Sequence, residues 1–88
     1  MLEHKDFKVS AYSKVQSLSG AIIGAIGDGF SPRLFAVGAG AVNQAVKACA
    51  AAKQRCDKKL CFDIDFFDAE IGEDTKSGIV ITISFKKE

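Results

Sequence analysis

The residues best suited to chemistry in this chain lie in the segment Gly38–Asn43, with the sequence GAGAVN. Glycine has no Cβ, so a ligand or another backbone can approach closely, and the first N–H groups of a following helix can bind an anion. The segment is one residue short of a dinucleotide-binding fingerprint, because Asn43 replaces the third glycine. A chain of 88 residues is also too short for two mononucleotide-binding halves, so we expect no cofactor. A phosphate contact and a tightly packed turn both remain open.

Two aspartates are the next candidates for chemistry. Asp63 and Asp65 are two residues apart, so in a strand both carboxylates share one face and could bind a divalent ion or act as acid and base. No histidine or lysine constellation supports either role, and the only histidine, His4, lies near the N-terminus. We interpret the pair as a solvated strand face, and we expect neither a metal site nor enzymatic activity.

The three cysteines are odd in number and irregular in spacing. Cys49, Cys56 and Cys61 match neither a disulfide framework nor the paired spacing of zinc-binding modules. We expect structural or free thiols, and their response to redox conditions stays open.

Length and charge predict a single globular domain over residues 1–88. The chain is 48% hydrophobic and 26% charged with a formal net charge of +1, so it lacks the strong basic excess of a typical nucleic-acid-binding domain. The longest apolar stretch is too short to span a bilayer and no signal peptide opens the chain, so we expect a cytoplasmic protein. Charge is nonetheless segregated along the chain. The basic group is Lys47, Lys53, Arg55, Lys58 and Lys59, and the acidic group is Asp63, Asp65, Asp68, Glu70, Glu73 and Asp74.

Hydrophobic spacing predicts the elements that must position these residues. A period of two indicates a half-buried strand, and apolar residues three and four apart indicate an amphipathic helix. Ser13 and Gln16 have the spacing of a capping box for the first helix. Gly20 and Gly24 fall inside that helix, where we expect a close neighbour to offset their low helix propensity. The expected strands are residues 6–11, 33–37, 60–67 and 78–85, and the expected helices are 14–26 and about 40 to 55–58.

The resulting order, βαβαββ, predicts an α/β (α+β) two-layer sandwich. Half-polar strands indicate that two helices cover one face of a four-stranded mixed sheet, while the other face meets solvent or a partner. The last two strands are expected to form a long hairpin, joined by residues 70–77.

Several segments of the chain also follow the pattern of a known family. They are Lys8–Ala11, Ser17 with Gly20–Ala21, Ala36–Ala48 and Phe67–Ile71. With these segments in this order, the chain resembles the stage V sporulation protein S family of small bacterial proteins, over about residues 7–85. That family is similar to Alba-type proteins, which share the βαβαββ order, dimerise and bind DNA or RNA.

The resemblance implies a non-enzymatic, homo-oligomeric, Alba-like regulatory protein that binds DNA or RNA and acts in sporulation. Alba-type contacts come from the loop after the first strand, the loop before the second helix and the hairpin arms. Here the second loop is glycine and alanine and the arm is acidic, so we expect contacts from backbone N–H groups and a few lysines, with two or three phosphates. The candidate contact residues are Ser13, Lys14, Gly38, Ala39, Gly40, Asn43, Gln44 and Lys47.

Two alternatives to nucleic-acid binding stay open from the sequence. In the first, the chain is an oligomeric protein-interaction or assembly module, whose acidic hairpin and exposed strand face pair with another subunit. In the second, the glycine turn binds the anionic group of a small metabolite.

Overall fold

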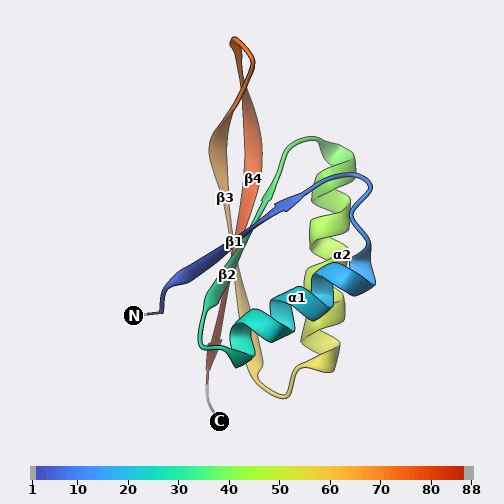
Figure 1. Ribbon diagram of the computed structural model, residues 1–88, viewed down its shortest axis with the longest axis vertical. Coiled ribbons are helices and arrows are strands. Elements are labelled where there is room, and N and C mark those ends of the chain that lie inside the picture. The colour runs from blue at the N-terminus through green and yellow to red at the C-terminus, as the bar shows by residue number, and fades with distance from the viewer. Residues whose placement is uncertain (1, 87–88) are drawn as a thin grey trace.

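Four strands form one mixed sheet, and two helices cover one of its faces (Figure 1). The computed structural model describes residues 2–86. This arrangement confirms the predicted two-layer α/β sandwich and its βαβαββ order. The elements are β1 (His4–Val9), α1 (Val15–Gly27), β2 (Ser31–Ala36), α2 (Ala39–Arg55), β3 (Lys59–Ile71) and β4 (Asp74–Lys86).

The strands lie in the order β1-β2-β4-β3, so β1 and β3 are the two edges of the sheet. β1 pairs with β2 in parallel, and β4 pairs antiparallel with both β2 and β3. The parallel pair requires a crossover, which α1 supplies between β1 and β2. The hairpin of β3 and β4 extends beyond the rest of the sheet as an arm (Figure 1).

The arm is longer than the sequence predicts. Residues 70–77 were expected to form the connection, but the strands pair as far as Ile71 and Asp74, across a two-residue turn of Gly72 and Glu73. Gly72 has a φ of 64°, the left-handed backbone that glycine adopts freely. Polar side chains therefore do not end the strands here, because backbone pairing continues wherever a tight turn holds the register.

The core lies between the helices and the sheet face that carries Leu34 and Ile81. Alternate residues of each strand point to this face, and the small residues of α2 allow the helix to lie close to α1 and the sheet. Its most buried members are Ile22, Ala25, Ile26, Leu34, Ala36, Ala45, Ala48, Ala52, Ile81 and Ile83.

Two local predictions for α1 are wrong. Lys14, not Ser13, is the N-cap residue, and no side chain among the described residues caps this helix. A Cβ added to Gly20 or Gly24 would meet no described atom within 4 Å, so neither glycine allows a close contact. The buried face of α1 instead contains Ser19, Ile22, Ala25 and Ile26.

Across residues 2–86, no helix is both long and apolar enough to cross a membrane.

Candidate nucleic-acid interface

The loop between β1 and α1, residues 10–14, packs against the first turns of α2. A Cβ on Gly40 would lie 2.8 Å from the Cβ of Ala11, so only glycine allows this approach without displacing the loop. Gln44 Nε2 donates a hydrogen bond to the carbonyl oxygen of Ser13 at 2.8 Å. The two loops that the sequence separates by more than 20 residues therefore form one surface, beside the N-terminal end of α2 (Figure 1).

Hydrogen bonds within the β1–α1 loop hold its shape. The backbone N–H of Ser10 donates to Ser13 Oγ at 2.9 Å, and the N–H of Tyr12 donates to Ser10 Oγ at 3.1 Å. The N–H of Ser13 donates to the carbonyl of Ser10 at 3.1 Å. With its backbone held in this way, the loop exposes the Tyr12 side chain almost fully, at 92%.

The start of α2 presents backbone to solvent. Gly38 is its N-cap residue, with φ 92° and ψ 155°, a region that side-chain-bearing residues essentially do not adopt. Within residues 2–86 no side chain caps this helix, and its first turn contains no acidic residue. Gly38, Ala39 and Gly40 are all exposed. The positive end of the helix dipole and the first N–H groups are therefore accessible to an anion.

The predicted contact residues divide into two groups. Ser13 and Gln44 are partly buried and hold the loop to the helix, so their structural role is established by contacts. Their neighbours on the surface are exposed and can reach a ligand. The exposed candidates are Lys14, Gly38, Ala39, Gly40, Asn43 and Lys47.

Tyr12 is a candidate residue that the sequence analysis missed. It directly follows the loop segment that packs on Gly40, and its ring is exposed. Exposed aromatic rings beside basic residues are typical of nucleic-acid-binding surfaces, because every base has a face on which a ring can stack. One signal was present in the sequence, since Tyr12 is the only tyrosine of the chain and lies in a polar loop.

The helix-free face of the sheet, which we call the open face, carries a row of interacting side chains. Arg33 donates two hydrogen bonds to Asp6, from Nε at 2.7 Å and from Nη2 at 2.9 Å. This bond lowers the pKa of the Asp6 carboxyl below its usual value. The Arg33 guanidinium lies 5.3 Å from the centre of the Phe35 ring, and Phe35 meets Phe67 edge to face with ring centres 5.0 Å apart.

A family comparison agrees with this architecture. The family model for stage V sporulation protein S (SpoVS) matches residues 5–86 of the 88-residue chain. The chain belongs to the SpoVS family. This confirms the resemblance noted from the sequence and relates the protein to sporulation. A search of curated proteins finds no match.

A second surface of the SpoVS-family chain is apolar and uncovered. Val46 of α2 and Ile64 and Phe66 of β3 are 48%, 61% and 74% exposed. They lie on the helix side of the sheet, where α2 leaves the edge strand β3 partly bare, and a shallow cavity of about 270 Å³ lies between the two elements. We call Val46, Ala50, Ile64 and Phe66 the α2–β3 surface. Exposed apolar patches of this kind are typical of interaction surfaces.

The aspartate pair of the SpoVS-family chain lies on the edge strand β3, at exposed positions. Asp63 and Asp65 are exposed on β3, and an oxygen of Asp65 accepts the N–H of Phe66 at 2.8 Å. Among the residues that the structure describes, no group of three or more His, Cys, Asp or Glu side chains is arranged to hold a metal ion.

One member of the basic group also has a structural contact, since Arg55 Nη1 donates to Ser19 Oγ at 2.9 Å.

The three free thiols of the SpoVS-family chain are expected to differ in reactivity. Cys49 is buried, and burial raises its pKa from 9.0 to about 11, so at pH 8 it holds about a hundredfold less thiolate than an ordinary thiol. Cys61 is exposed and Cys56 is partly buried. Mass spectrometry after iodoacetamide treatment should find Cys61 modified in the folded protein and Cys49 modified only in urea. Equal rates at Cys49 and Cys61 would show that the core opens readily.

The same pKa shift makes a contribution to stability that depends on pH. Because the folded-state pKa of Cys49 is raised, the neutral thiol favours folding below pH 9, and this contribution is lost as the pH rises from 9 towards about 11.

Proposed function

We propose that this protein is a non-enzymatic, homo-oligomeric regulator in sporulation that binds nucleic acid through the β1–α1 loop and the start of α2. The observation that supports this most is the packing of the loop on Gly40 and its hydrogen bond to Gln44. These contacts hold the β1–α1 loop, with its exposed Lys14, next to the uncapped N–H groups at the start of α2. A lysine and free helical N–H groups together suit the phosphates of a nucleic-acid backbone.

The small net charge of the chain limits the affinity expected of this site. A formal charge of +1 gives no long-range attraction, so affinity must come from a few local contacts. Lys14 is exposed at the N-cap of α1, and Lys47 is exposed in the third turn of α2. The arm carries exposed Glu70, Glu73 and Asp74, which repel phosphate, so the arm does not grip a duplex in this proposal.

Self-association is the second part of the proposal. A small site with two or three phosphate contacts binds weakly, and two linked copies raise the overall affinity without new contacts. The α2–β3 surface offers apolar side chains beside an edge strand, and a second copy of this chain would bury both. The Alba-type resemblance implies dimers as well.

The salt dependence of binding tests the proposal. Fluorescence anisotropy with short single-stranded RNA, single-stranded DNA and duplex DNA should show affinity falling between about 7-fold and 40-fold from ~50 to ~200 mM salt, as two or three phosphate contacts require. Lys14→Ala should weaken binding to all sequences alike. It should also reduce the slope of log affinity against log salt concentration by about one, as the loss of one phosphate contact requires.

Lys59→Ala is the matched control, because Lys59 is an exposed lysine at the start of β3, outside the proposed interface. Binding that is undetectable at ~50 mM salt would overturn the nucleic-acid proposal. Equal losses for Lys14→Ala and Lys59→Ala would remove the loop from the site.

An assembly module without nucleic-acid binding is the alternative function. The exposure of Ile64 and Phe66 on β3 favours it, because an exposed apolar patch is typical of a protein-interaction surface whether or not nucleic acid binds. A stable oligomer that binds none of the three nucleic acids would support this alternative.

A further inference from the structure

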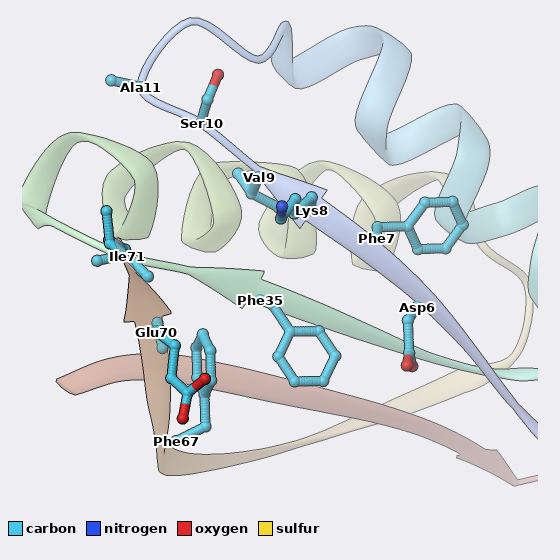
Figure 2. A pocket seen from close by; sticks show the side chains of 12 residues that line it. Asp6, Phe7, Lys8, Val9, Ser10, Ala11, Phe35, Phe67, Glu70 and Ile71 are labelled. Carbon is cyan, nitrogen blue, oxygen red and sulfur yellow. The ribbon is translucent and has the colours of Figure 1, made fainter. Parts of the chain in front are cut away.

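A groove of about 710 Å³ lies on the open face, between β1 and the end of β3 (Figure 2). One wall consists of consecutive residues of β1 and the following loop, from Asp6 to Ala11, and the other of Ala69, Glu70 and Ile71. Phe35 and Phe67 lie between the walls (Figure 2). The volume is within the range of small-ligand sites, about 300–1,000 Å³.

Phe35 and Phe67 form the floor of the groove, and Gly78 leaves the space that the Phe67 ring occupies. Phe67 lies across Gly78 of β4, where a Cβ would be 2.5 Å from the Phe67 ring and 2.9 Å from the carbonyl oxygen of Ala36. The ring therefore rests on bare backbone, in edge-to-face contact with Phe35. Both rings are only partly buried, so they offer apolar and π surface to a flat ligand.

The groove continues into the proposed nucleic-acid interface. Ser10 and Ala11 line it and also belong to the loop that packs on the start of α2, and the exposed ring of Tyr12 follows them. Lys8 of the β1 wall is exposed and lies two residues before this loop. Glu70 on the opposite wall repels phosphate, so a bound strand would pass along the Lys8 side.

We infer that this groove binds an unpaired base of a single-stranded nucleic acid whose backbone crosses the β1–α1 loop. The inference rests on the proposed function and names its substrate class. A base stacks on aromatic side chains irrespective of sequence, and only an unpaired base is free to leave its neighbours and enter a groove. Lys8 supplies the charge for its phosphate, and the rings of Phe35 and Phe67 supply the stacking surface.

The decisive comparison is between two oligomers of equal charge. A thymidine 12-mer and an abasic 12-mer have the same phosphates, but only the first has bases. Anisotropy titration at ~50 mM salt should give about tenfold tighter binding to the thymidine 12-mer. Tyr12 is the only tyrosine and the chain has no tryptophan, so quenching of tyrosine emission reports a base at the loop directly.

Substitutions of the groove residues test whether the base binds in the groove. Phe35→Leu and Phe67→Leu should each weaken binding of the thymidine 12-mer about fivefold to tenfold and leave the abasic 12-mer unaffected. Phe30→Leu is the matched control, since Phe30 is also partly buried but directly precedes β2, outside the groove lining and outside the α2–β3 surface. Glu70→Gln should strengthen binding, and Glu73→Gln at the arm tip, outside the groove lining, should have a smaller effect.

Each outcome distinguishes this inference from the proposed function. If the two 12-mers bind equally and Phe35→Leu and Phe67→Leu leave the affinity unchanged, the groove site is overturned and phosphate binding is left intact. Failure of both 12-mers to bind would overturn the groove site, and failure of single-stranded RNA and duplex DNA as well would overturn both proposals. If Phe35→Leu changes the oligomeric mass in analytical ultracentrifugation, the groove is a contact between copies and the inference fails. Lys8→Gln, at an exposed position, tests the groove even if the phenylalanine variants unfold.

Discussion

Replacing Gly78 with alanine is expected to lower the free energy of unfolding by about 2–3 kcal/mol. The added Cβ would lie 2.5 and 2.8 Å from two atoms of the Phe67 ring and 2.9 Å from the carbonyl oxygen of Ala36. The ring can rotate away, but the carbonyl belongs to β2, which is paired with β4 at this point. Urea unfolding followed by circular dichroism measures the change.

Gly24→Ala is the control for the same chemical change at an unobstructed site. Gly24 is an exposed helical residue, and a Cβ there meets no described atom within 4 Å, so alanine should raise stability by up to about 1 kcal/mol. Combining Gly78→Ala with Phe67→Leu should recover only part of the loss, because the Ala36 carbonyl is still in the way. A Gly78→Ala protein as stable as its parent would show that β2 and β4 separate there at little cost.

Ile64→Lys is expected to dissociate the proposed oligomer and to reduce apparent nucleic-acid affinity by about 10-fold to 100-fold. Ile64 is 61% exposed on the α2–β3 surface, so a lysine there costs little in the free monomer. In a complex between two copies the same lysine would be buried without a partner. Analytical ultracentrifugation gives the mass of the variant, and anisotropy titration gives its affinity.

Ser84→Lys adds an equal charge to an exposed position of β4 on the opposite face of the sheet. It should preserve the mass and leave affinity unchanged or slightly higher. If Ile64→Lys retains the oligomeric mass of the parent, the copies associate through another surface. If the parent itself is a monomer at working concentrations, the self-association proposal fails.

These two predictions concern opposite faces of one sheet. The face under the helices is buried except at β3, where the α2–β3 surface remains exposed. The open face has an ion pair, two aromatic rings and a groove that leads to the β1–α1 loop. A single sheet can therefore serve self-association at one edge and ligand binding on the other side, without one surface blocking the other.

Local patterns were sufficient to predict the fold. Phe62, Ile64 and Phe66 alternate with aspartates, and Ile79, Ile81 and Ile83 alternate with smaller residues, which requires two-faced strands whatever the rest of the chain does. The helices follow in the same way from apolar spacing. The matched family confirms the resemblance that the segment from Ala36 to Ala48 suggested.

Local patterns were insufficient where a distant neighbour decides the outcome. Ser13 has the spacing of a helix cap, yet Ser10 and Gln44 bind it instead, because the loop folds onto α2. Gly20 and Gly24 were expected to pack closely, whereas Gly40 and Gly78 are the glycines that do. Nothing in the sequence near Gly78 indicates the ring of Phe67.

By itself, the sequence determined the element order, the class of the fold, the family and the glycine-rich start of the second helix. These depend on periodicity, chain length and backbone conformation, which are properties of short segments. Only the tertiary structure decided what lies beside Gly40, which rings share the open face and which apolar residues remain uncovered. Those facts depend on strand order and on the extension of the arm, which join residues far apart in the chain.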